Sequence, residues 1–109
     1  ADEKGFWAIG VDQDQSAVSN NNKVLCSMIK RVDVGTYTIV KAYADNTFKG
    51  GVTELGLKEE GVGYSDGGKN VSAELAAQVE KYKAAINDGT IAVPATREEL
   101  ETFKPVEIK

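Results

Sequence analysis

Carboxylates and amides gather in one short polar segment, Asp12-Gln13-Asp14-Gln15-Ser16, which directly follows an apolar run. The Asp-x-Asp-x-Ser spacing is that of the start of an EF-hand loop, but such a loop needs glycine at its sixth position and a bidentate glutamate at its twelfth. Ala17 and Lys23 stand at those positions, which disfavours calcium. A carboxylate can instead accept hydrogen bonds from two vicinal hydroxyls, as acidic residues do at a ribose. The spacing alone favours a third interpretation, a solvated loop.

A second segment, Gly63 to Asn70, nearly matches a phosphate-binding loop, with two glycines and Lys69 in register. Asn70 stands where a serine or threonine would bind magnesium. Asp66 also places a negative charge inside the phosphate cradle. An expected helix after the loop is its one supporting feature. Binding of a nucleoside triphosphate is therefore kept as an alternative, and ATP hydrolysis that is lost in Lys69→Ala would support it.

Nucleophilic catalysis finds little support in this chain, which has no histidine and a single cysteine, Cys26. Without histidine, Ser-His and Cys-His arrangements cannot form within the chain, and one cysteine makes neither a disulfide nor a zinc site. We therefore expect no enzyme, no catalytic residue, no metal and no cofactor. Lys30 is placed at the start of an expected helix, where it can donate to a ligand hydroxyl. The aromatic residues could stack on a base, but most of them fit a core more simply; they are Trp7, Tyr37, Tyr43 and Tyr64.

The elements that position these residues begin with an apolar run, Phe6 to Val11, which is typical of a strand buried on both faces. A polar loop from residue 12 to 23 follows, and then a short strand, Val24 to Ser27. From Met28 to Tyr43, apolar residues recur at spacings of three and four, which predicts a helix. Asn46 and the glycines after it should end that helix.

The second half of the chain continues with an expected strand, Val52 to Leu57, and a turn-rich stretch, Gly61 to Gly68. A helix is predicted over Leu75 to Ile86, with Ser72 as its N-cap and Gly89 after its end. Residues 91–93 are short and extended. Residues 96–99, Thr-Arg-Glu-Glu, match a capping box and predict a short helix.

The order of these elements predicts an α/β fold with a largely parallel sheet flanked by helices. The first strand should lie centrally, because its run is apolar throughout. Ligands bind such sheets beyond the carboxyl ends of the strands, where Asp12 and Asp14 stand.

Composition limits the classes of partner. The formal charge is -4, the isoelectric point is about 4.8, and no basic stripe is present, so nucleic-acid binding is not expected. No apolar run approaches 18 residues, so no membrane span is expected. The 109 residues fit one domain. The chain begins at Ala1 without an initiator methionine or a secretion signal, and we expect it to be a fragment cut from a longer protein.

Several stretches together resemble the basic membrane protein family of ABC-transporter substrate-binding lipoproteins, which includes purine-nucleoside receptors. The resemblance covers nearly the whole chain and corresponds to the C-terminal third of a full-length member. Two departures are Cys26, where threonine or serine is usual, and Glu60, where many members have glycine. The stretches that carry the resemblance are residues 7–15, WAIGVDQDQ, residues 24–34, VLCSMIKRVDV, residues 48–51, FKGG, residues 56–63, GLKEEGVG, and residues 91–94, IAVP.

The resemblance implies a periplasmic-binding-protein type I fold, in which two lobes close over a small solute by hinge motion. It implies that Asp12 binds the ribose hydroxyls of a nucleoside and that Lys30 helps to hold the sugar. It also implies an extracytoplasmic, membrane-anchored lipoprotein that delivers solute to an ABC permease. A ligand sensor on the same fold is the alternative role. A fragment of this kind would carry only part of the site, and its exposed surfaces could cause self-association.

Overall fold

The computed structural model describes residues 3–108, which form two compact units, one up to Val71 and one from Ser72 onward. The first unit contains the strands, a 3-10 turn and a long helix. The second contains two helices. Both candidate segments of the sequence, around Asp12 and around Asp66, belong to the first unit.

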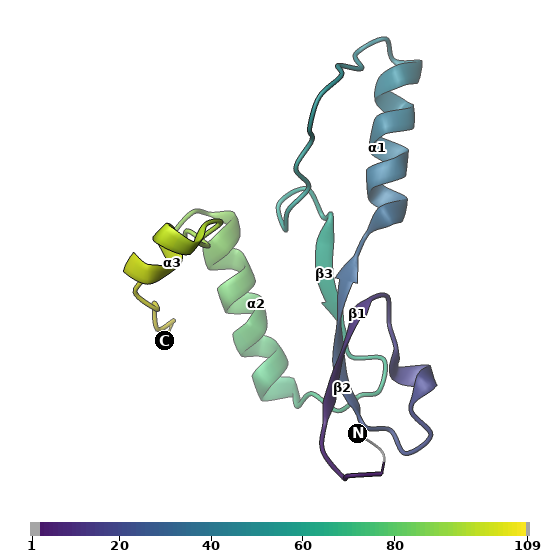
Figure 1. Ribbon diagram of the computed structural model, residues 1–109, viewed down its shortest axis with the longest axis vertical. Coiled ribbons are helices and arrows are strands. Elements are labelled where there is room, and N and C mark those ends of the chain that lie inside the picture. Colours follow the sequence, from purple (N-terminus) through teal and green to yellow (C-terminus); the bar gives the residue numbers. More distant parts are fainter. Residues whose placement is uncertain (1–2, 109) are drawn as a thin grey trace. The chain divides into compact units, whose positions relative to one another are not determined.

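The first unit is built on a sheet of β1 (Ala8–Asp12), β2 (Val24–Lys30) and β3 (Val62–Ser65), in the order β1-β2-β3 (Figure 1). β1 and β2 run parallel, whereas β2 and β3 run antiparallel. The α/β class is therefore confirmed. The expectation that the first strand lies centrally is wrong, because β2 takes the central place by pairing on both of its edges.

The expectation that the first strand is buried on both faces is also wrong. Ile9 is 66% exposed, whereas its neighbour Gly10 is buried. The turn after β1, with its 3-10 helix η1 (Ser16–Val18), covers the Gly10 face of the strand pair and leaves Ile9 exposed on the other face. An added Cβ at Gly10 would overlap the hydroxyl of Ser27, so this close approach requires glycine.

The long helix of this unit, α1 (Val32–Ala44), starts later than the apolar spacing predicts. Met28 belongs to β2, where it pairs with Val11 on one side and with Tyr64 on the other. Hydrogen bonding to two neighbouring strands thus overrides the helical periodicity, and Lys30 is the last residue of β2 rather than the start of a helix. The predicted end of the helix is confirmed: Asn46 follows it in the left-handed conformation, with φ of 57°.

The segment from Thr47 to Gly61 returns along α1 to the sheet without forming a regular strand (Figure 1). The strand expected at Val52 to Leu57 is therefore wrong. Leu55 instead packs against α1, close enough that an added Cβ at Gly35 would lie 3.3 Å from its Cδ1 atom. The turn-rich stretch that follows contains β3, which the sequence did not predict.

The second unit confirms the predicted caps. In α2 (Ala73–Asn87), the Ser72 hydroxyl accepts from the Leu75 amide at 3.2 Å, and Gly89 follows the helix with φ of 84°. α3 (Arg97–Thr102) begins with a complete capping box between Thr96 and Glu99. Ala85 and Ile91 are the buried apolar residues of this unit.

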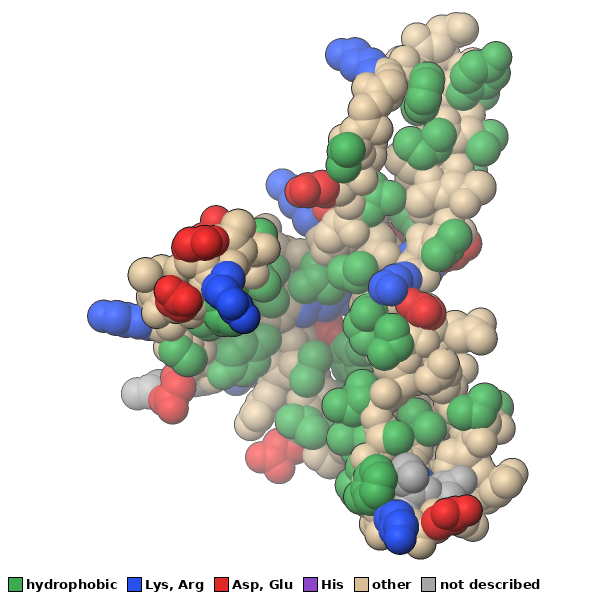
Figure 2. Space-filling view, in the orientation of Figure 1, with side chains coloured by type: hydrophobic (Ala, Val, Ile, Leu, Met, Phe, Trp, Pro, Cys, Tyr) green, Lys and Arg blue, Asp and Glu red, His purple; other side chains and the backbone are tan. Residues whose placement is uncertain are grey.

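Apolar side chains remain at the surface in both units, and Figure 2 shows them spread over the viewed face. On α1, Val32, Val40 and Tyr43 are each more than half exposed. Within residues 3–108, neither α1 nor α2 is long and apolar enough to cross a membrane.

Candidate functional site

The two residues that the sequence singles out for ligand binding, Asp12 and Lys30, meet in the structure. Asp12 ends β1 and Lys30 ends β2, and because these strands are parallel, both residues stand at the same edge of the sheet. The Lys30 ammonium lies 2.7 Å from Oδ1 of Asp12. A carboxylate and an ammonium are thus presented side by side at the carboxyl ends of adjacent parallel strands, where α/β sheets bind ligands.

The backbone at Asp12 is unusual and explains how the pair forms. Asp12 is paired in register with Ile29, so regular alternation would direct it to the opposite face from Lys30. Its φ of 76° lies in the left-handed region, which breaks the alternation at the strand end. Aspartate tolerates this conformation better than most residues. The left-handed turn therefore brings the carboxylate to Lys30.

The pair remains open to solvent, since the side chains of Lys30 and Asp12 are 56% and 66% exposed. Exposed ion pairs contribute about 0–1 kcal/mol, so a ligand can rearrange this one at small cost. The contact uses one carboxylate oxygen, and a carboxylate has about four acceptor positions. The pair can therefore accept hydroxyl protons through Asp12 and donate to a hydroxyl or ring oxygen through Lys30.

Asp14, two residues further on, is engaged differently. Its Oδ1 accepts from the Ser16 amide at 2.9 Å, and its Oδ2 accepts from the Ser65 hydroxyl at 2.8 Å. The hydrogen bond from the Ser16 backbone, followed by that from Ser65, lowers the pKa of Asp14 below 3.8. Ser65 is 51 residues away in the chain, so no local pattern could have identified it as a partner.

The neighbours of Asp14 are held as well. The Gln15 amide donates to the hydroxyl of fully buried Ser27 at 3.0 Å. The backbone of Gly67 lies so close to the Asp14 carboxylate that an added Cβ would overlap it. Residues 14–16 are thus tied to β2, to the end of β3 and to the glycine turn after it.

In the segment from Gly63 to Asn70, which nearly matches a phosphate-binding loop, an aspartate of the segment itself binds the backbone amides. Asp66 accepts from the backbone amides of Asn70 at 2.7 Å and Val71 at 2.9 Å, which are groups of the kind that cradle phosphate in a true loop. α2 begins only at Ala73, behind its own cap at Ser72. The alternative of nucleoside-triphosphate binding is therefore disfavoured, because a carboxylate already fills the place of the anion.

Asn70, at the position of the missing magnesium ligand, has a structural role that the sequence did not suggest. Its side-chain amide donates to the Val24 carbonyl at 2.7 Å and exchanges hydrogen bonds with Asn22. These contacts attach the glycine turn to the start of β2. The signal that could have indicated this role is a pair of turn-forming asparagines, but 48 residues separate them.

The aromatic candidates for base stacking are spread over different elements. Trp7 precedes β1 at its other end, where the Lys23 ammonium lies 4.9 Å from the ring centroid. Tyr37 and Tyr43 are exposed on α1, which also contradicts their interpretation as core residues. Tyr64 lies in β3, opposite Met28.

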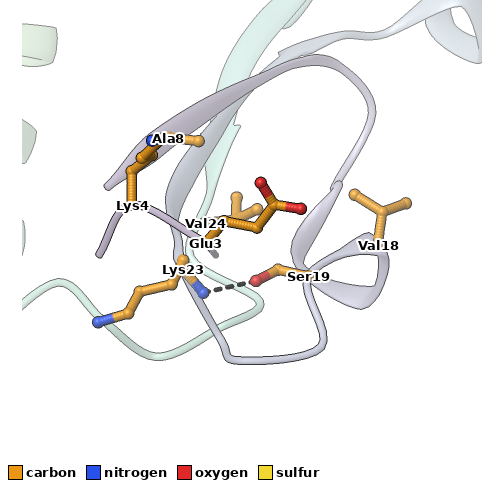
Figure 3. Close-up of a pocket in the computed structure, with 7 residues that line it drawn as sticks. All are labelled: Glu3, Lys4, Ala8, Val18, Ser19, Lys23 and Val24. Atoms are coloured by element: carbon orange, nitrogen blue, oxygen red, sulfur yellow. Dashed lines mark hydrogen bonds between the residues drawn. The ribbon is translucent and has the colours of Figure 1, made fainter. Parts of the chain in front are cut away.

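A shallow hollow of about 370 Å³ lies beside the first residues of β1 and β2, at the opposite end of the parallel pair from Asp12 (Figure 3). The one hydrogen bond drawn in it joins the Lys23 amide to the Ser19 hydroxyl at 2.7 Å. Its lining residues are Glu3, Lys4, Ala8, Val18, Ser19, Lys23 and Val24. This hollow shares no residue with the Asp12–Lys30 pair.

Comparison with known proteins gives a consistent result. Residues 1–97 match the family described as ABC transporter substrate-binding protein PnrA-like. The chain is 38% identical over 100 residues to the CD4+ T-cell-stimulating antigen of Listeria monocytogenes, covering 84% of this chain and 28% of that protein. It is 37% identical over 101 residues to basic membrane protein D of Borreliella burgdorferi, covering 89% of this chain and 29% of that protein.

Two solved structures share the fold. One is an ABC transporter solute-binding protein from Aeropyrum pernix, with a TM-score of 0.62, 25% identity, and coverage of 88% of this chain and 35% of that one. The other is a transcriptional activator of the comK gene from Bacillus halodurans, with a TM-score of 0.73 and 18% identity, covering 83% of this chain and 31% of that one. The chain therefore spans less than a third of the length of its curated relatives quoted above.

Proposed function

This chain belongs to the PnrA-like family of ABC transporter substrate-binding proteins, and from that premise we propose that it is the C-terminal portion of a two-lobed protein that binds a purine nucleoside. The single observation that carries the proposal is the Asp12–Lys30 pair, which stands exposed at the carboxyl ends of two parallel strands. The match over 97 residues supports the solute-binding role, and the chemistry of the pair supports a ligand with vicinal hydroxyls.

The proposed mechanism is binding without bond cleavage. Solute enters between two lobes, Asp12 accepts hydrogen bonds from the ribose hydroxyls, and Lys30 donates to the sugar. Contacts that form only in the closed state favour closure over the ligand. An ABC permease then takes the solute from the closed form.

The exposed apolar side chains support the view that further polypeptide packs on this part. Ile9 and Val11 in β1, and Val32 and Val40 on α1, are exposed in this chain. Burying such side chains stabilises a fold by about 1.5–3 kcal/mol each. We therefore place the rest of the two-lobed protein against these surfaces. We also propose an extracytoplasmic, membrane-anchored lipoprotein, in line with an uncharacterized lipoprotein of Pyrococcus abyssi that is 40% identical over 88 residues.

The test is calorimetric titration of the full-length protein with inosine and guanosine. We expect Asp12→Ala to weaken nucleoside binding by at least about tenfold, because hydrogen bonds to a charged group contribute about 1.5–3 kcal/mol. Asp45→Ala is the matched control, since it also removes an exposed aspartate that is paired with a lysine, Lys41, at 2.6 Å. Unchanged affinity in Asp12→Ala would overturn the assignment of Asp12, and absence of nucleoside binding in the unaltered protein would overturn the ligand.

A further inference from the structure

Asp12 owes its orientation to a backbone conformation that few residues adopt unaided. Its φ of 76° costs free energy in an L-residue and persists where the surroundings determine it. The closest fixed point after it is Asp14, only two residues away. A rotation of the intervening peptide units would change the direction of the Asp12 carboxylate relative to Lys30.

Three groups lie against the Asp14 carboxylate. The Ser16 amide and the Ser65 hydroxyl occupy its two oxygens, at 2.9 Å and 2.8 Å. The Gly67 backbone also lies close to Oδ2, where an added Cβ would overlap the carboxylate. Since β3 ends at Ser65, this contact fixes the turn after β1 to the far edge strand of the sheet.

Resting on the proposed function, we propose that Asp14, together with Ser65 and Gly67, is a positioning group that holds Asp12 in its left-handed conformation and thereby sets recognition of the ribose hydroxyls. Asp14 does not itself contact the ligand. Both of its oxygens accept hydrogen bonds from within the protein, whereas only one oxygen of Asp12 is paired, and its partner is an exposed lysine. The two aspartates of one short segment therefore have different tasks.

The first measurement needs no ligand. Crystal structures of the full-length protein are compared for the unaltered sequence and for Ser65→Ala, a substitution that removes only the side-chain hydroxyl that donates to Asp14. We expect Asp12 to leave the left-handed region and its carboxylate to move out of hydrogen-bond distance of Lys30. Gly67→Ala, which places a methyl group against the carboxylate, should do the same.

The second measurement compares two ligands that differ only in the hydroxyls. Titration with inosine and with 2′,3′-dideoxyinosine should show that Ser65→Ala weakens the binding of inosine about tenfold. This is the loss expected when a hydrogen bond between the ribose and the charged Asp12 carboxylate is broken. The affinity for dideoxyinosine should stay unchanged, since it has no hydroxyl for Asp12 to bind. A merely structural role for Asp14 would weaken both ligands equally.

Asp88→Ala is the matched control, because Asp88 also accepts from the amide two residues ahead, that of Thr90 at 2.8 Å, but lies in the second unit. It should leave both measurements unchanged. An intact Asp12–Lys30 pair in Ser65→Ala, or equal loss of both ligands, would overturn the positioning role. If the pair opens in Ser65→Ala while the unaltered protein binds no nucleoside, the positioning role stands and the proposed ligand falls.

Discussion

At the scale of residues, Asp12 and Asp14 are the same amino acid in different surroundings. Asp12 ends a strand with its side chain 66% exposed and paired with Lys30. Asp14 accepts hydrogen bonds from a backbone amide and from a serine of another strand. The sequence indicates that this polar segment follows the carboxyl end of a strand, but it cannot separate the surroundings of the two aspartates because Ser65 is distant in the chain.

The titration of Asp14 gives a prediction at this scale. Hydrogen bonds from Ser16 and Ser65 hold its folded-state pKa below 3.8. Ionised Asp14 therefore contributes stability that is fully present above about pH 4 and is lost as the pH falls through the lowered pKa. Ser65→Ala should raise the pKa of Asp14 toward 3.8, because one of the stabilising hydrogen bonds is gone.

Carbon-detected NMR titration of the aspartate carboxyls measures this pKa directly. Asp33 serves as an internal control, because its pKa is lowered chiefly by a hydrogen bond from Arg31 and should not respond to Ser65→Ala. An unchanged Asp14 titration in that variant would mean that Ser65 does not bind the carboxylate in solution.

At the scale of elements, local signals predicted well and long-range ones did not. The N-cap at Ser72, the capping box at Thr96 and the glycine after α2 each depend on residues within one turn, and each is confirmed. Strands depend on partners. Met28 joins β2 because β1 and β3 pair with it, and no such partner exists among the described residues for the strand expected at 52–57.

The glycine-rich stretch before α2 also shows that a strand cannot be predicted without knowing its partner strand. Its composition favours turns, yet residues 62–65 form β3 because β2 presents a free edge there. The position of Asp12 at the end of a strand could be predicted, since it follows an apolar run. The pairing with Lys30 could not, because the apolar spacing from Met28 onward assigned Lys30 to a helix.

Ser27, in β2, is expected to contribute to the stability of the fold. Its hydroxyl is fully buried and accepts from the Gln15 amide, which attaches the turn after β1 to the sheet. Ser27→Ala removes that acceptor, and we expect a loss of about 1–3 kcal/mol in the free energy of unfolding. Urea unfolding measures the loss.

Amide hydrogen exchange locates the effect of Ser27→Ala. The Gln15 amide should exchange faster, whereas the Arg31 amide, which donates to the Gly61 carbonyl at 2.8 Å, should exchange as before. Equal exchange of Gln15 in both proteins would contradict the role given to Ser27.

At the scale of the whole molecule, two observations converge. The chain spans less than a third of the curated relatives it matches, and it leaves large apolar side chains of β1 and α1 exposed. Both agree with the proposal that the Asp12 edge faces a second lobe, which would supply the remaining contacts to a solute. The family match covers residues 1–97 and includes every residue of the proposed site and of the group that positions it.

The most direct test of nucleoside binding at Asp12 is a crystal structure of the full-length protein with bound inosine. We expect the ligand between two lobes, with the Asp12 carboxylate within about 3 Å of the ribose hydroxyls and Lys30 beside the sugar. Asp14 should remain bound to Ser65, away from the ligand. Ribose hydroxyls held by other residues, with Asp12 still facing solvent, would contradict the role proposed for Asp12.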